Sequence, residues 1–176
     1  MISKKNGRRE TEDHEFGTNP CSEIILRSRE FCNLSEIVIR PEDTMDSLKS
    51  KVRLATILGT FQSTLTNFKY VQKDWKKNCQ EERLLGVSMT GIMDSVLTNG
   101  KQSGLKERLE ELKQIAVDTN KKLAKEIGIN QSAAITCVKP SGTVSQLVDS
   151  ASGIHARHNP YYIRTVRGDI KDPLSK

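Results

Sequence analysis

The stretch Gly17-Thr18-Asn19-Pro20-Cys21-Ser22-Glu23-Ile24 carries an amide, a thiol and a carboxylate at strict two-residue intervals. In an extended backbone, side chains at positions i, i+2 and i+4 point the same way. Pro20 fixes its own φ and pushes Asn19 towards the extended region, and Gly17 gives freedom at the entry, so this segment is predicted to be a stiff, shaped loop. We therefore expect Asn19, Cys21 and Glu23 to share one face and to present a thiol to a bound ligand.

A cysteine in a chain of this kind is more often a small buried hydrophobe than a reactive group. The residues around Cys21 favour the reactive alternative. The run from Thr18 to Ile24 resembles the thiyl-radical loop of ribonucleotide reductases. Gly17-Thr18-Asn19-Pro20-Cys21 followed by Glu23-Ile24 is similar to the adenosylcobalamin-dependent, class II form of that loop.

A second cysteine follows Cys21 by eleven residues. The segment Cys32-Asn33-Leu34-Ser35-Glu36 resembles the part of monomeric class II reductases that carries one of the reductant cysteines. The corresponding spacing is longer in class I enzymes, so it favours the cobalamin-dependent branch. The β-branched run from Phe31 to Ile39, ended by Pro41, predicts a buried strand, and a buried inert thiol is the alternative at Cys32.

A third signal lies towards the end of the chain. Ala133 to Val138 predicts a strand, Lys139 to Thr143 a tight loop, and Val144 to Val148 the start of a helix. A helix N-terminus after a small polar turn offers backbone N–H groups to an anion, although a plain N-cap uses similar residues. The stretch also resembles the reductase loop that holds the substrate phosphates. The resemblance implies phosphate contacts by Pro140, Ser141, Gly142, Thr143, Val144 and Ser145.

The middle of the chain predicts a long amphipathic helix that starts at Asp43 or Thr44, either of which is a suitable N-cap. Steps of three or four residues define one apolar stripe that we expect to be buried. Its members are Leu48, Val52, Ala55, Leu58, Phe61, Leu65 and Phe68.

A charged connection is expected over residues 69–82, and the small-residue run Arg83 to Asp94 favours close backbone packing over ligand binding. A second helix is predicted over Leu105 to Ile127, with Ser103 as its cap and Gly128 as its end.

Composition restricts the function classes. The 176 residues suffice for one domain, with 35% hydrophobic and 28% charged residues and a net charge of +6. The basic residues are dispersed and accompany no nucleic-acid-binding motif, so direct nucleic-acid binding is not expected. No apolar run has the length of a membrane span and the start lacks a signal peptide, so we expect a cytoplasmic protein without a membrane partner. The four cysteines show no zinc spacing, so we expect no metal site of this chain's own.

The family resemblance, from Phe16 to Leu174, implies an α/β fold: part of a ten-stranded α/β barrel with Cys21 at the tip of an inner loop. Residues 1–15 are expected to be a flexible or truncated lead-in, and residues 16–176 a partial catalytic barrel. The effector region, the first barrel half and the C-terminal cysteine-bearing tail of the family are missing. We infer a split subunit that assembles with a second chain carrying the rest of the barrel, a remnant, or a truncated reading frame.

The resemblance also implies a reaction: reduction of a ribonucleotide, expected to be a triphosphate, to its 2′-deoxy form with adenosylcobalamin as cofactor. Cys21 would carry the thiyl radical, Glu23 would accept the 3′-hydroxyl proton, Asn19 would bind the sugar, and Cys32 would supply reducing equivalents. An external dithiol such as thioredoxin would reset the cysteine pair. The second cysteine of that pair is unassigned, because neither Cys79 nor Cys137 lies in a matching context. A catalytically silent remnant or nucleotide-phosphate-binding module is the alternative function.

Overall fold

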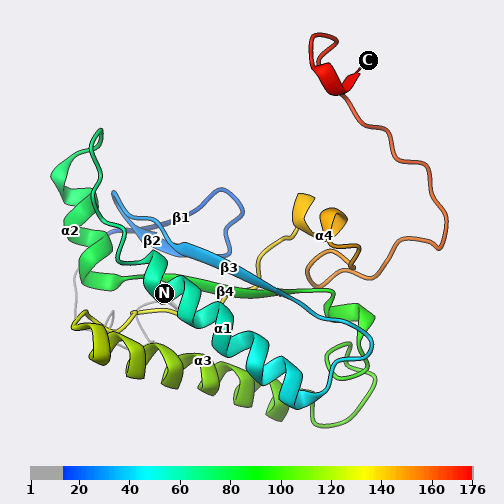
Figure 1. The fold of residues 1–176 in the computed structure, drawn as a ribbon, viewed down its shortest axis with the longest axis horizontal. Helices are drawn as coiled ribbons and strands as arrows, with labels where there is room; N and C mark the ends of the chain where they lie inside the picture. The colour runs from blue at the N-terminus through cyan, green and yellow to red at the C-terminus, as the bar shows by residue number, and fades with distance from the viewer. Residues whose placement is uncertain (1–13, 176) are drawn as a thin grey trace.

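The computed structural model describes residues 14–175, so the lead-in expected over residues 1–15 falls almost entirely outside the described part. Helices and strands follow one another along the chain, as an α/β fold requires (Figure 1). The elements are β1 (Phe16–Thr18), β2 (Ile25–Arg27), β3 (Asn33–Val38), α1 (Met45–Gln62), α2 (Lys73–Glu82), β4 (Leu85–Thr90), the 3-10 turn η3 (Ile92–Asp94), α3 (Leu105–Ile127), α4 (Thr143–Leu147) and the 3-10 turn η4 (Pro173–Ser175).

The central sheet consists of β3 and β4, which run parallel in register along all six residues of each strand. Parallel strands need a long crossover connection, and here α1 and α2 supply it. A third segment joins the other edge of β4 through one parallel bridge between Val87 and Thr136. The strand predicted over Ala133 to Val138 is therefore reduced to this single bridge.

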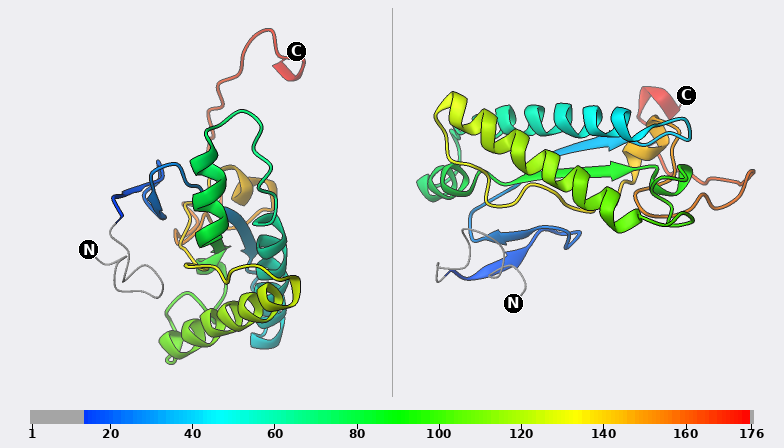
Figure 2. Two further views of the ribbon diagram at one scale, coloured as in Figure 1. Left: turned by 90° about the vertical axis from the view of Figure 1, so that its left-hand side faces the viewer. Right: turned by 90° about the horizontal axis from the view of Figure 1, so that it is seen from below.

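Two layers flank the sheet. Helices α1 and α3 pack side by side over one face, and the antiparallel β1–β2 hairpin lies on the opposite side (Figure 2). The hydrophobic core lies between the sheet and these two helices. Its buried members are Ile37, Ile39, Leu48, Val52, Ala55, Leu85, Val87, Leu112, Ala116 and Ile135.

Helix α1 begins as the sequence predicts and ends earlier than predicted. The Thr44 side chain accepts a bond from the Ser47 N–H at 3.2 Å, and the Thr44 N–H donates to the Ser47 hydroxyl at 3.0 Å, which forms a capping box. The first half of the expected apolar stripe is buried. Within α1, Leu58 and Phe61 are exposed, at 66% and 49%, because α3 covers a face that is rotated towards Thr56 and Thr60. Leu65 and Phe68 lie beyond the end of the helix, where Leu65 is exposed and Phe68 is half-buried against Phe31.

The connection over residues 69–82 contains a helix, α2, which the sequence pattern does not predict. It is strongly polar, and only Cys79 and Glu82 of its residues are buried. A buried arginine of β2 secures the hairpin to this helix: Arg27 bonds Glu81 at 3.0 Å and lies 3.2 Å from a carboxylate oxygen of Glu82. Charge complementarity therefore replaces apolar packing between α2 and the hairpin.

Helix α3 matches its predicted bounds, although Gly104, at φ 79°, stands at the N-cap instead of Ser103; Gly128 ends the helix as expected. One fully buried polar residue, Asn120, ties α3 to its neighbours. Its amide nitrogen donates to the Thr60 and Ser132 hydroxyls at 3.0 and 2.9 Å, and its oxygen accepts the Ser132 N–H.

No sheet of the described residues has more than two strands, so these residues alone do not form the expected ten-stranded barrel. None of the helices in residues 14–175 is long and apolar enough to span a membrane.

Candidate active site

The loop between β1 and β2 forms a tight turn, so the expected extended backbone is wrong. The Ser22 N–H donates to Asn19 O at 2.9 Å, and the Asn19 side-chain oxygen accepts the Ile24 N–H at 3.0 Å. Pro20 thus occupies the second position of a β-turn, which suits its fixed φ, and Ser22 reverses the chain with a φ of 62°. The three polar side chains consequently do not share one strand face.

The thiol and the carboxylate of this turn differ in their exposure to solvent. Cys21 is exposed, whereas the Glu23 side chain is only 4% exposed. Lys139, from the loop that precedes α4, donates to Glu23 Oε1 at 3.0 Å. The second oxygen, Oε2, is buried and accepts no hydrogen bond from any described residue.

The protonation state of Glu23 follows from these neighbours. Burial raises its pKa, but the Asn19 amide, the Glu23 backbone N–H and the Lys139 ammonium outweigh burial and hold the pKa below its usual range. The same contact raises the pKa of Lys139. The pair is therefore a carboxylate and an ammonium at neutral pH, and Oε2 of the carboxylate is a buried oxygen without a hydrogen bond from the described residues.

The loop expected to bind phosphate is held in place mainly by its own serines. Ser141 is buried and donates to Glu36 Oε2 at 2.9 Å, and the buried Ser145 donates to the carbonyls of Ser141 and Gly142 at 2.9 and 2.7 Å. Helix α4 has only five residues. The exposed residues of this loop are Pro140, Gly142, Thr143 and Val144.

Two residues of the site were not recognised as such from sequence. Glu36 bridges the sheet to the loop, because its Oε1 accepts the Ser88 hydroxyl at 3.2 Å while Oε2 accepts that of Ser141. Lys139 was predicted only as a member of the loop, yet it joins that loop to the cysteine-bearing turn. One sequence feature could have indicated Glu36: side chains alternate along β3, and this alternation puts Glu36 on the face that points away from the helices.

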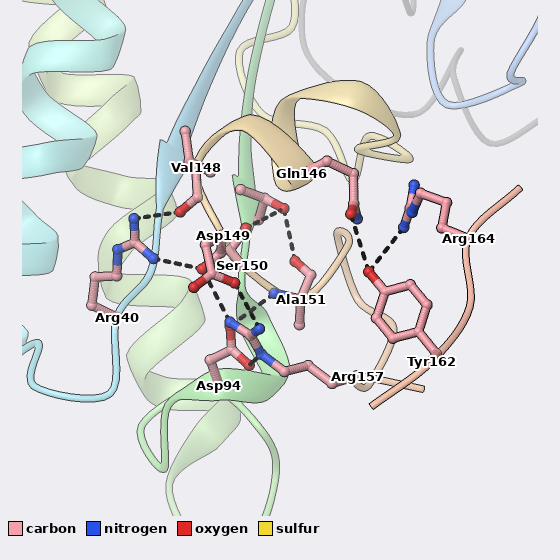
Figure 3. A network of polar contacts seen from close by, with 11 residues as sticks. Arg40, Asp94, Gln146, Val148, Asp149, Ser150, Ala151, Arg157, Tyr162 and Arg164 are labelled. Carbon is pink, nitrogen blue, oxygen red and sulfur yellow. Dashed lines mark hydrogen bonds and ion pairs between the residues drawn. The ribbon is translucent and has the colours of Figure 1, made fainter. Parts of the chain in front are cut away.

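The segment after α4 is fastened by a network of arginines and aspartates (Figure 3). Arg157 contacts both oxygens of Asp94, at 3.0 and 3.2 Å, and reaches an Asp149 carboxylate oxygen at 2.9 Å. Arg40 donates to the carbonyls of Val148 and Asp149. Burial raises the pKa of Asp94, but Arg157 and the Ala151 N–H outweigh it and lower the pKa. The network holds the end of α4 against the end of the sheet.

Cys32 lies immediately before β3 and is half-buried. Its sulfur lies 3.9 Å from the backbone oxygen of Asn33. Cys79 is buried in α2. The described residues contain no group of three or more His, Cys, Asp or Glu side chains that could hold a metal ion.

Comparison with known proteins identifies relatives of the whole described unit. No protein-family model matches the chain. The chain is 32% identical over 188 residues to the adenosylcobalamin-dependent ribonucleoside-triphosphate reductase of Lactobacillus acidophilus, covering 93% of this chain and 25% of the relative. It is 30% identical over 174 residues to the protein of the same name from Euglena gracilis, covering 98% of this chain and 23% of the relative.

A crystal structure of a B12-dependent, class II ribonucleotide reductase matches with a TM-score of 0.67 and 28% identity, over 87% of this chain and 25% of that one. Fold and sequence together show that the chain is homologous to one portion of the ribonucleotide reductase chain. Its relatives are specifically the adenosylcobalamin-dependent ribonucleoside-triphosphate reductases, which confirms the resemblance found in the sequence. The chain spans about a quarter of their length.

Proposed function

We propose that this chain forms the reactive part of a ribonucleoside-triphosphate reductase, in which a thiyl radical on Cys21 begins the reduction. The observation that carries the proposal is the Glu23 carboxylate beside it: ionised, buried, held by Lys139 through one oxygen and without a partner on the other among the described residues. A general base must be ionised and must have a lone pair that can take the proton, and Glu23 meets both requirements, although its lowered pKa makes it a weaker base than a carboxylate of ordinary pKa. Homology at about 30% identity supports the same reaction class.

Each residue of the turn has a role that its geometry permits. Cys21 is exposed and removes the hydrogen atom from C3′ of the ribose. Glu23 accepts the 3′-hydroxyl proton on Oε2, while Lys139 keeps the carboxylate charged and oriented. The oxygen of Asn19 accepts the Ile24 N–H and its amide also acts on Glu23, so the remaining hydrogen of the amide nitrogen would donate to the sugar.

The net reaction consumes two thiols. The C2′–O bond breaks and its hydroxyl leaves as water, a C2′–H bond forms, and two thiols become a disulfide. Cys32 supplies one of these thiols, and an external dithiol such as thioredoxin regenerates it by exchange. The triphosphate of the substrate lies against the exposed part of the Pro140–Ser145 loop, where Gly142, Thr143 and Val144 offer backbone N–H groups and a hydroxyl.

The relatives are named as adenosylcobalamin-dependent, and the same cofactor is proposed here. When bound, it supplies the radical. The exposure of Cys21 suits a thiol that must be reached from outside the chain. No residue of this chain is assigned to the cofactor.

The catalytic unit needs more than the described sheet. We propose that residues 16–176 form part of the ten-stranded barrel and that the remaining strands come from further polypeptide, either a second chain or a longer form of this one. The two-stranded sheet and its single additional bridge support this proposal, since an open parallel sheet presents unpaired edges.

A Cys21→Ala substitution in the native assembly tests the function. Turnover of ribonucleoside triphosphate should fall to the background rate with nucleotide binding retained, while the matched Cys79→Ala variant should keep its activity if it folds. Undiminished turnover by Cys21→Ala would refute the radical role. If wild-type assembly binds nucleotide but never reduces it, the chain is a phosphate-binding module instead.

A further inference from the structure

Two arginines of the described residues are buried, and they differ in their surroundings. Arg27 is 7% exposed and lies 3.0 Å from Glu81 and 3.2 Å from Glu82. Arg83 is 9% exposed, but no carboxylate of the described residues lies within ion-pair distance of its guanidinium. Burial lowers the pKa of Arg83, and no described neighbour raises it. Proteins normally pair the charges that they bury, so the charge of Arg83 lacks its usual compensation.

The two edges of the Arg83 guanidinium are used differently. Nη1 donates to Ser63 O at 2.6 Å, at the C-terminal end of α1, where a cation is favourable. The other edge consists of the Nε and Nη2 N–H groups, which point the same way. Neither donates to a described residue, and Nε is buried. Two parallel N–H groups match the two oxygens of a carboxylate, so capping of α1 leaves one carboxylate-binding edge open.

The backbone at Arg83 gives a second, independent observation. Arg83 is the C-cap of α2, its N–H donates to Cys79 O at 2.9 Å, and β4 begins two residues later (Figure 1). Its φ of 45° lies in the left-handed region, which glycine adopts more easily than arginine. Because the backbone favours glycine here, an arginine indicates a use for its side chain.

The surroundings of Arg83 indicate where its anion comes from. The neighbouring carboxylate in the sequence, Glu82, is already held by Arg27. The Ser63 hydroxyl donates to Thr60 O at 2.7 Å, so it is not free to help the guanidinium bind a phosphate. Among the described strands β3 pairs on one edge alone, and the chain spans about a quarter of the length of its relatives. The missing carboxylate is therefore expected from polypeptide outside this chain.

We propose that the open edge of Arg83 binds a carboxylate side chain of the polypeptide that supplies the remaining strands. The proposal rests on the proposed function, in which further polypeptide completes the sheet. Arg83 is then a docking residue, and it takes no part in the chemistry at Cys21. A lysine at this position keeps the charge and can still cap α1, but it cannot offer two parallel N–H groups. Arg83→Lys therefore separates docking from capping.

Amide hydrogen exchange of the 176-residue chain alone and of the native assembly tests the contact. Residues 79–85 should exchange roughly tenfold more slowly in the assembly than in the chain alone. Arg83→Lys should remove most of this extra protection in the assembly and should change the chain alone little. Arg53→Lys is the matched control at an exposed arginine of α1, and it should keep the protection. An unchanged urea midpoint for Arg83→Lys shows that the variant folds.

Three outcomes would overturn the contact. Residues 79–85 of the wild type could exchange equally fast alone and in the assembly, or Arg83→Lys could keep full protection, which would leave Arg83 as a cap alone. Excess inorganic phosphate could protect the same residues in the chain alone, which would make the edge a small-anion site.

Failure of the contact and failure of the proposed function give different results. If Arg83→Lys loses the protection but the wild-type assembly reduces no nucleotide, the contact stands and the proposed function fails. If the assembly reduces nucleotide while Arg83→Lys keeps full protection, the function stands and the contact fails.

Discussion

The two faces of the sheet are stabilised in different ways. On the helix side, α1 and α3 bury a continuous apolar core against β3 and β4. On the hairpin side, the turn that carries Cys21, the loop before α4 and the C-terminal segment are joined by ion pairs and side-chain hydrogen bonds such as Lys139–Glu23, Glu36–Ser141 and Arg157–Asp94. The apolar core therefore lies on the helix side, and the proposed site lies on the polar hairpin side.

Removing core volume should produce the largest loss of stability. Leu48 is fully buried between α1 and the sheet, so Leu48→Ala should cost about 3 kcal/mol of unfolding free energy. Leu58 belongs to the same predicted stripe but is 66% exposed, so Leu58→Ala should change stability by less than about 0.5 kcal/mol. Urea titration of both variants measures the difference, and equal losses would contradict the packing described here.

The second-largest loss of stability is expected when the buried hydrogen bonds of Asn120 on the helix side are removed. Asn120→Ala leaves the Ser132 N–H without its acceptor in a fully buried site, which should cost about 2 kcal/mol. Asn130→Ala is the control, because Asn130 is exposed and bonds only carbonyls at the surface. Urea titration measures the unfolding free energy of both variants. A small loss of unfolding free energy for Asn120→Ala would mean that water readily replaces the hydrogen bonds of Asn120.

The bridge between sheet and loop should affect the site more than the fold. Glu36→Ala frees the Ser141 and Ser88 hydroxyls, so amide hydrogen exchange should accelerate over residues 139–147 and leave α1 and α3 unchanged. Glu36→Gln keeps one acceptor oxygen and should restore part of the protection. Faster exchange throughout α1 would instead show that Glu36 supports the whole domain.

The Glu23–Lys139 pair should appear in the pH dependence of stability. The folded pKa of Glu23 lies below the ordinary value of 4.5, so its contribution is present above about pH 4.5 and is lost as the pH falls through the folded pKa. Lys139→Met removes one cause of the lowering, so acid unfolding should begin at a higher pH. The exposed ion pair of Lys122 with Glu126 provides the control, and Lys122→Met should leave the acid transition unchanged.

The smallest effect is expected at the C-terminal network. Arg157 is half-exposed, so Arg157→Ala should cost less than about 1 kcal/mol of global stability. Limited proteolysis should nevertheless cut the chain after residue 149 faster, because the segment loses its attachment to Asp94. Unchanged cleavage would show that Arg40 alone holds this segment.

The helix side could be predicted from sequence because its signals are local. The Thr44 cap, the Gly128 end and the apolar strand of β3 each depend on neighbours within a few residues. Helix α2 was missed because its residues are too polar to show an apolar stripe. The exposed half of the α1 stripe was predicted wrongly because periodicity alone does not say which face α3 covers.

The backbone of the turn and the contacts on the hairpin side were not predicted from sequence, for different reasons. The prediction that Asn19, Cys21 and Glu23 share one extended face is wrong because Asn-Pro favours a turn over a strand. The sequence contains this turn signal, but the prediction gave more weight to the two-residue spacing of the polar side chains. The partner of Glu23 lies 116 residues away in the chain, and that of Glu36 lies 105 residues away. No pattern within a short window reports such contacts, so the family resemblance indicated candidate site residues but not how the fold holds them.

The distance along the chain between Glu23 and Lys139 also sets an order of events during synthesis. The turn that carries Cys21 leaves the ribosome early, but the lysine that holds its carboxylate emerges more than a hundred residues later. Until then Glu23 lacks the ammonium that bonds its Oε1, although the turn's own hydrogen bonds can form. A chain interrupted before residue 139 therefore carries Cys21 but never forms the Glu23–Lys139 contact.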